Sequence, residues 1–367
     1  MLQIEAIQTV MPTKSTDPKT SSNIKVVPQD LNNSTIFLQR RFNIVLCYKK
    51  SCDEDSGWIV AGWIKESLGR ALAEQPVFAG RVRRQSEESG DLFVVSDDSG
   101  VRLVEGKAEM KLDDFLNLKS KGQIETELVF WEDVFQLNPR FSPLFYVQVT
   151  NFSCGGYSIG ISCSLLLADP FVLTTFLNNW SNLHNEIVSK PNLPKIPLFY
   201  LPNLAKPGSS SPYSQTTPKS AAAQSIIFTI PTNILNSDNN IINYTYNDIV
   251  ALCIDKAEHE VGTKMASKFS LLVKLPPEDF KVEIMSREKL SSSIIDNVDG
   301  LSCGKIWDEV IKVDEICFGL GNKPEYASCW INNSIVLDDG DDEEGFVMII
   351  ASDDLNTLGM KIVVTFP

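Results

Sequence analysis

Residues 157–165 contain the pattern that most constrains the fold of this chain. They read Y-S-I-G-I-S-C-S-L, in which apolar residues or cysteine alternate strictly with Ser or Gly. Strict period-two alternation predicts a β-strand with one apolar face. Leu165 then lies on the same face as Ile161 and Cys163. The opposite face carries only Gly and Ser, so another segment can approach it closely.

The flanking residues predict the neighbours of this strand. Residues 145–150 alternate in the same way, and Cys154-Gly155-Gly156 supplies a turn, which predicts a β-hairpin. After the strand, Asp169 is a favoured helix N-cap and Pro170 a favoured first helical residue. Apolar residues then recur at helical spacing, so we expect a strand, a short loop and a capped helix.

The first half of the chain alternates predicted strands and helices. A helix is predicted over 58–72, and D-L-F-V-V-S-D-D-S-G-V-R-L-V-E predicts a second hairpin that turns at 98–100. A helix is predicted from Thr245 to about His259. Residues 205–224 are rich in Ser, Thr and Pro and predict an exposed crossover linker.

Composition excludes some classes of protein. The chain has 367 residues, 43% of them hydrophobic, and a formal net charge of −14, which argues against nucleic-acid binding and against electrostatic docking on anionic lipid. The net charge does not exclude a local basic pocket around Arg81, Arg83 and Arg84. The N-terminus does not resemble a secretory signal, and no apolar run reaches the length of a membrane span. The eight cysteines include no C-x-x-C, and most lie in apolar runs. Since no secretory signal is expected, we expect reduced core thiols and a cytosolic location or the cytosolic face of a membrane.

Catalytic and metal signals are weak. The two histidines, His184 and His259, fit no catalytic triad, and we expect them to be solvated or to lie at helix ends. The acidic run 338–344 lacks the spacing of a calcium loop and predicts a solvated turn, so no metal site is expected. The segment Cys317-Phe-Gly-Leu-Gly321 lacks the full G-x-G-x-x-G pattern of dinucleotide binding.

Two segments together resemble a known family. S-L-L-L-A-D at 164–169, followed by a helix with F-L-N-N-W, resembles the H-x-x-x-D-G region of plant BAHD acyl-CoA acyltransferases. C-F-G-L-G-N-K-P at 317–324 resembles their D-F-G-W-G-K-P. The resemblance implies an α/β fold of two chloramphenicol-acetyltransferase-like domains with mixed sheets, joined by the crossover linker and separated by a solvent channel. The domains would span 1–204 and 225–367, the second apparently shortened.

The resemblance also implies a chemistry, and the sequence departs from it. In the family, a histidine is the general base that deprotonates a hydroxyl or amine for attack on an acyl-CoA thioester. Leu165 occupies that position here, and Pro170, Cys317 and Leu320 replace the motif Gly, Asp and Trp. The retained residues, to which the resemblance gives structural roles, are Asp169, Phe318, Gly319 and Gly321. A general base contributes about 10²- to 10⁴-fold, and neither Ser164, on the opposite face, nor Cys163, expected to be a buried thiol, replaces it.

Within the family, the sequences of residues 97–105, 140–162 and 166–170 most resemble the eceriferum (cuticular wax) branch. That resemblance implies a non-catalytic partner of a β-ketoacyl-CoA synthase at the cytosolic face of the endoplasmic reticulum, acting in very-long-chain fatty acid elongation. No cofactor is expected, although acyl-CoA could be a ligand. An active acyl-CoA-dependent acyltransferase is the alternative, and a different reaction such as a lyase, in which the substrate supplies its own base, is a third.

Overall fold

The computed structural model describes residues 2–17, 23–28, 37–50, 57–84, 92–190, 197, 223–231, 246–275, 279–290, 301–302, 304–319, 321–332, 345–351 and 359–366. Most of the predicted linker (205–222), the acidic run 338–344, Thr245 and Leu320 lie outside the described residues. The described chain forms an α/β fold built on two mixed sheets, as expected from the resemblance.

The first sheet has six strands in the order β1-β6-β7-β8-β3-β12. They are β1 (Leu2–Val10), β6 (Val101–Ala108), β7 (Phe145–Phe152), β8 (Tyr157–Ser164), β3 (Arg41–Tyr48) and β12 (Tyr326–Ile331). The hairpin predicted to turn at 154–156 is β7–β8, with Phe145 opposite Cys163 and Gly155 in the turn at a φ of +86°. This prediction is therefore confirmed.

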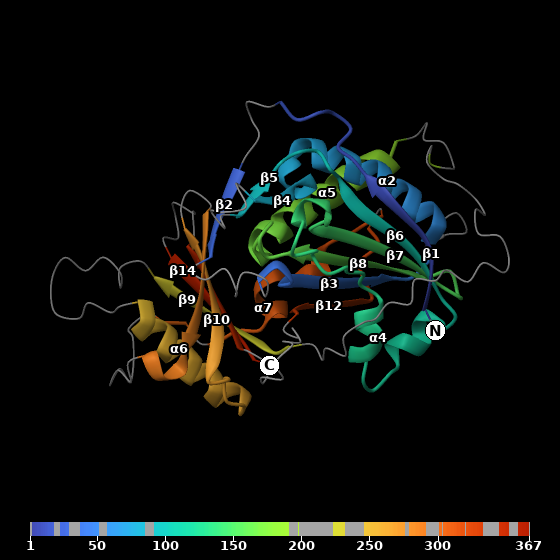
Figure 1. Cartoon of the computed structure of the whole chain (residues 1–367). Helices are drawn as coiled ribbons and strands as arrows, with labels where there is room; N and C mark the ends of the chain where they lie inside the picture. Colours follow the sequence, from blue (N-terminus) through green and yellow to red (C-terminus); the bar gives the residue numbers. More distant parts are fainter. Residues whose placement is uncertain are drawn as a thin grey trace.

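Two long helices cover one face of this sheet. The predicted helix 58–72 is α2 (Gly57–Glu74), and the predicted capped helix is α5 (Pro170–Val188). They pack on each other, and α2 lies over β6 and β7 (Figure 1). The short helices α3 (Leu112–Leu116) and α4 (Gly122–Glu127) contribute to a separate apolar cluster that contains Val45 and Cys47 of β3.

The second sheet has eight strands in the order β4-β5-β2-β11-β10-β13-β14-β9. They are β4 (Arg81–Arg84), β5 (Leu92–Val95), β2 (Asn23–Pro28), β11 (Asp279–Ser286), β10 (Lys268–Leu275), β13 (Gly345–Ala351), β14 (Gly359–Thr365) and β9 (Ser225–Pro231). One face packs against α6 (Tyr246–Val261), the helix predicted to end near His259. The other face joins the large apolar cluster of the first sheet.

The two sheets exchange strands across the expected domain boundary. Strands β2, β4 and β5, which precede β6 in the chain, complete the second sheet, whereas β12 completes the first. β12 pairs with β3 and is followed in the chain by the second-sheet strand β13. The short helices α7 (Trp307–Ile311), η4 (Arg287–Lys289) and η5 (Val313–Glu315) lie in the second half, and η1 (Pro76–Ala79) and η2 (Pro139–Phe141) in the first. The segments 1–204 and 225–367 therefore do not correspond strand for strand to the two sheets.

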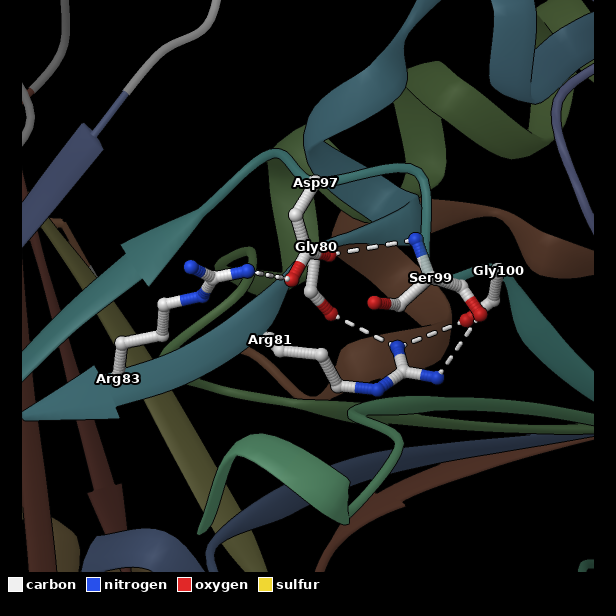
Figure 2. Close-up of polar contacts among 6 residues, drawn as sticks. All are labelled: Gly80, Arg81, Arg83, Asp97, Ser99 and Gly100. Atoms are coloured by element: carbon white, nitrogen blue, oxygen red, sulfur yellow. Dashed lines mark hydrogen bonds and ion pairs between the residues drawn. The ribbon is translucent and has the colours of Figure 1, made fainter. Parts of the chain in front are cut away.

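The second predicted hairpin, turning at 98–100, is wrong. β5 pairs with β4 and β2 in the second sheet, whereas β6 pairs with β1 and β7 in the first. Residues 96–100 are thus a crossover between sheets. Arg81 fixes it by donating to the carbonyl oxygens of Gly80, Ser99 and Gly100 at 2.9, 3.2 and 2.7 Å, as Figure 2 shows. Turn chemistry alone does not distinguish this crossover from a hairpin turn, because Gly100 has a positive φ in it as well.

Candidate functional site

The strand that carries the candidate site is buried on both faces. Every residue of β8 is buried, and Ile159, Ile161 and Cys163 belong to the large apolar cluster. The Gly and Ser face is approached closely, as predicted: a Cβ added at Gly160 would lie 1.8 Å from the carbonyl oxygen of Leu128. The segment around Leu128 therefore covers this face of the sheet.

Leu165, to which the resemblance assigns the position of the family's base, lies directly after β8 and has no exposed surface. Its backbone N–H donates to the carbonyl oxygen of Arg40 at 3.0 Å, and the N–H of Ser164 donates to that of Leu144 at 2.8 Å. Two neighbouring segments thus hold this turn in place, and Leu165 is packed as a core residue.

The cluster that contains Leu165 extends across to the second sheet. Besides Leu166 and Leu167, which are also buried, it includes residues of the inner face of that sheet, namely Leu272, Phe280, Val282, Phe346, Met348, Ile350 and Val363. The guanidinium of Arg40, itself 1% exposed, lies 5.0 Å from the centre of the Phe346 ring. The base position is therefore enclosed by a continuous apolar core that both sheets share.

Asp169 performs two structural roles at the start of α5. Its Oδ1 accepts from the backbone N–H groups of Phe171 and Val172 at 2.9 and 3.0 Å, which is N-cap geometry. Its Oδ2 accepts from Nζ of Lys274 on β10 at 3.0 Å, and both side chains are largely buried. The carboxylate thus caps the helix and ties it to the second sheet, and both of its oxygens have partners.

The other titratable groups near Leu165 do not provide a base. Burial raises the pKa of the Cys163 thiol far above its ordinary value, with a smaller contribution from the charge of Asp169. Arg40 carries a permanent positive charge and cannot accept a proton. Cys163 is thus the buried, unreactive thiol that the sequence analysis expected.

His184 is a buried histidine, and the expectation of a solvated or helix-end histidine is wrong for it. It is 4% exposed, its Nδ1 lies 3.1 Å from Oγ of Ser67, and Nε1 of Trp180 donates to the same Oγ at 2.9 Å. Burial lowers the pKa of His184 to about 4, so the ring is neutral at pH 7. It lies 14 residues beyond Pro170 on α5, about 21 Å along the axis, too far to replace the base.

His259 lies in the last turn of α6 and is exposed, as expected for a helix-end histidine. Neither of the two histidines of the chain is therefore placed to act as a base beside Leu165.

The second motif is anchored on the far end of α5. Phe318 is 1% exposed and packs edge-on against Trp180 and His184, with ring centroids 4.7 and 5.5 Å apart. Asn185 binds both sides of Phe318: its Nδ2 donates to the carbonyl oxygen of Cys317 at 2.8 Å, and its Oδ1 accepts from the N–H of Gly319 at 2.9 Å.

The two glycines of this motif have backbone conformations that suit glycine. Gly319 and Gly321 have φ angles of +107° and +72°, in a region that residues with a side chain rarely adopt. The Cys317 side chain is partly exposed, and its thiol contacts the carbonyl oxygen of Glu315. Residues 317–319 pack against the C-terminal part of α5, and the described side chains of this motif show no catalytic arrangement.

The arginines of the possible basic pocket all have partners within the chain. Arg81 is 4% exposed and bound to backbone carbonyls, and burial lowers its pKa to about 10. Arg83 pairs with Asp97 at 2.8 Å, whose other oxygen accepts from the N–H of Ser99 (Figure 2). Arg84 donates to the carbonyl oxygen of Gln136. They therefore do not form the open basic pocket that the sequence left possible.

Sequence reasoning missed Lys274, Arg40 and Asn185, which position the two motifs. Lys274 lies near the end of the strand K-F-S-L-L-V-K-L, where a lysine is expected to be exposed. No local pattern links it to Asp169, 105 residues earlier. These contacts join residues far apart in the chain and exist only in the folded protein.

Comparison with known proteins establishes the family. The model described as Transferase family matches residues 7–240, more than half of the chain, so the chain belongs to this family, the BAHD acyltransferases. Protein ECERIFERUM 26-like of Arabidopsis thaliana is 34% identical over 118 residues, which cover 32% of this chain and 27% of the relative. Protein ECERIFERUM 2 of the same plant is 30% identical over 126 residues, 32% of this chain and 30% of the relative.

Other relatives carry the names of enzymes. A hydroxycinnamoyltransferase of Narcissus pseudonarcissus is 26% identical over 166 residues, 44% of this chain and 34% of the relative. The matched segments thus span roughly a third of these curated relatives. A crystal structure of vinorine synthase superposes with a TM-score of 0.49 and 16% identity, covering 100% of this chain and 95% of that one.

Two further observations concern membrane spans and metal ions. None of the helices in the described part of the chain has the length and hydropathy that crossing a membrane requires. Within the same residues, no group of three or more His, Cys, Asp or Glu side chains is arranged to hold a metal ion.

Proposed function

We propose that this chain is a BAHD-family protein that acts without a catalytic base. It would be a partner of a β-ketoacyl-CoA synthase in very-long-chain fatty acid elongation towards cuticular wax, at the cytosolic face of the endoplasmic reticulum. The observation that carries the proposal is Leu165, fully buried at the base position inside a core that both sheets share. The similarity to two ECERIFERUM proteins supports the direction of the proposal.

The energetics of the site support a role without acyl transfer. A positioned general base lowers a barrier by roughly 3 to 5 kcal/mol, which an acyltransferase would lose with leucine at this position. The nearby groups do not restore it, because the Cys163 thiol is protonated, Arg40 is cationic and Asp169 is bound on both oxygens. The motif residues that remain have structural contacts: Asp169 links α5 to the second sheet, and Phe318 packs against α5.

The test is co-expression with an elongase condensing enzyme, with the chain length of the acyl products as the readout. Wild type, Leu165→His and Leu165→Met are compared, and circular dichroism is used to verify that each variant is folded. We expect all folded variants to lengthen the products to the same extent, because the proposed role does not use residue 165 chemically. An unchanged product distribution with every condensing enzyme tried would contradict the proposal.

The alternative is an active acyltransferase that uses acyl-CoA as donor, which membership of a transferase family and the hydroxycinnamoyltransferase match favour. A neutral amine acceptor or a chain of water molecules would then replace the base. It is distinguished by incubating the purified chain with acyl-CoA and a panel of hydroxyl and amine acceptors. Turnover by wild type that changes in Leu165→His but not in Leu165→Met would establish it.

A further inference from the structure

An apolar loop projects from the first half of the chain between residues 135 and 141. It reads F-Q-L-N-P-R-F, and Phe135, Leu137 and Phe141 are 57%, 83% and 65% exposed. Half of the exposed large hydrophobic side chains among the described residues lie in this one loop; the others are Met11, Val172 and Ile306. Such a concentration of exposed apolar side chains marks an interaction surface more often than scattered single residues do. We call residues 135–141 the apolar loop.

The apolar loop is held in place at both ends. The N–H of Phe135 donates to Oγ of Ser142 at 2.8 Å, which closes the loop. Gln39 binds the backbone of Val134 through both its amide oxygen and its amide nitrogen, at 2.9 and 3.0 Å. Val134 is buried beneath the loop.

Further bonds fix the loop from the side and within. Arg84 donates to the carbonyl oxygen of Gln136 at 3.0 Å, and the N–H of Asn138 donates to the carbonyl oxygen of Phe135 at 3.1 Å. Pro139 is buried, and the Arg140 guanidinium lies 4.5 Å from the centre of the Phe141 ring. The loop is therefore a fixed platform that presents apolar side chains outward.

The size of this surface indicates which partner it fits. The three side chains together expose on the order of 400 Å² of apolar area, about half of what each partner contributes to a standard protein–protein interface. A second copy of the chain or a folded partner would need a larger contact. A bilayer surface accepts a few apolar side chains that penetrate the interface while the rest of the protein stays in water.

The charges around the loop indicate the kind of bilayer. The cations Arg84 and Arg140 are balanced by the exposed carboxylates Glu132 and Asp133, and Arg83 is paired with Asp97. The net charge of the whole chain is −14, which opposes approach to an anionic surface. Aromatic rings and an arginine on an apolar stem are side chains that membrane interfaces accommodate well.

We propose that the apolar loop inserts into the interface of a zwitterionic phospholipid bilayer and docks the chain on it by apolar contacts. Phe135, Leu137 and Phe141 reach the boundary between the headgroups and the acyl chains, and the Arg140 guanidinium remains at headgroup level. This docking does not depend on the elongase role, because vesicle binding is measured on the purified chain without a condensing enzyme.

The experiment is flotation of the purified chain with phosphatidylcholine vesicles, and with vesicles that also contain phosphatidylserine, at low and high salt. We expect the wild type to float with phosphatidylcholine vesicles at both salt concentrations. The double variant L137S/F141S should lower the bound fraction about tenfold or more, because it removes most of the inserted apolar surface. Met11→Ser is the matched control: Met11 is 59% exposed outside the loop, so its replacement should leave binding unchanged. Thermal melts verify that both variants are folded.

Three results would overturn the proposal. Wild type that stays with the unbound fraction shows that the loop does not dock on lipid, and wild-type binding that the double variant retains shows that another surface does. Binding only to phosphatidylserine vesicles, lost in high salt, shows electrostatic docking instead. None of these results bears on the acyl-chain-length test, so failure of docking and failure of the elongase role are separately detected.

Discussion

At the scale of single residues, the two oxygens of Asp169 have different partners. Oδ1 satisfies two backbone N–H groups at the start of α5, and Oδ2 neutralises Lys274, whose side chain is only 14% exposed. Loss of the carboxylate would therefore leave the N-terminus of α5 uncapped and the largely buried Lys274 ammonium group without this ion-pair partner.

We expect Asp169→Ala to lower the free energy of unfolding by about 2 to 5 kcal/mol, from the lost cap and the unpaired lysine. Asp169→Asn keeps a good N-cap and removes only the charge, so it should cost less. Urea unfolding followed by circular dichroism measures both. Equal losses for the two variants would show that the cap contributes nothing.

The second prediction at this scale concerns His184. Burial lowers its pKa to about 4 in the folded chain, below the ordinary value near 6.5. Between these values the unfolded chain binds more protons than the folded chain, so stability is present above pH 6.5 and is lost as the pH falls towards 4. The loss should be about 3 kcal/mol.

The measurement is unfolding in urea from pH 7 to pH 4.5, repeated for His184→Gln and His259→Gln. The His184→Gln variant should show a weaker dependence on pH, because the buried ring no longer titrates. The exposed His259 is the matched control, and its replacement should leave the slope unchanged. A slope that both variants share with wild type would mean that His184 is not responsible.

The sequence predicted some site residues because their local signals are strong. Asp169 followed by Pro170 is a typical helix start. The alternation of residues 157–165 predicts that Leu165 lies with Cys163 on the apolar side, and both belong to the large apolar cluster, although Leu165 lies in the turn after β8. The burial of His184 had a local signal, because it follows Leu177 and Trp180 by seven and four residues on one face of α5. Its partners were not predictable, because Ser67 and Phe318 lie 117 residues before and 134 residues after it.

At the scale of elements, Gly160 decides how closely β8 is covered. A methyl group at residue 160 would lie 1.8 Å from the carbonyl oxygen of Leu128, which is backbone and must shift as a whole. The segment between α4 and the apolar loop therefore depends on this glycine for its position.

We expect Gly160→Ala to destabilise the chain by about 2 kcal/mol or more through overpacking. Gly122→Ala is the control, since a Cβ at Gly122 meets nothing within 4 Å, and it should leave stability unchanged or raise it by up to about 1 kcal/mol. Differential scanning calorimetry of the two variants tests the contrast. Similar melting temperatures would contradict the close approach.

The elements themselves were largely predictable, but their partners were less so. The β7–β8 hairpin follows from two alternating runs and a glycine turn that are adjacent in the chain. The pairing of β5 with β4 and β2 rather than with β6 has no local signal, and Arg81 binds the crossover at Ser99 and Gly100. A turn signal shows that the chain bends, and only distant contacts decide which sheet it enters.

At the scale of the whole molecule, each sheet contains strands from both halves of the chain, and this joins the two sheets. β2, β4 and β5 lie in the second sheet and β12 in the first, and one apolar cluster runs through both. The composition of 205–224 indicated a linker in the sequence, but composition carries no information about which strands cross.

We expect residues 1–204 and 205–367 not to fold when each is expressed alone, because each would lack strands of its sheet and expose part of the shared cluster. Expressed together, they should recover soluble material with the near-ultraviolet circular dichroism of the intact chain. A native-like cooperative melt of 1–204 alone would show that the exchanged strands are dispensable.

The exchange also sets the timing of folding during synthesis. β2 pairs with β11 at Phe280 opposite Val26, about 250 residues later in the chain. At typical ribosomal rates of roughly 5 to 20 residues per second, β11 is synthesised on the order of 10 to 50 seconds after β2, so the edge of β2 that faces β11 is unpaired for that time. During that interval an unpaired strand edge is open to other nascent chains, so the amount of folded protein obtained in a cell should depend on the chaperones that shield it.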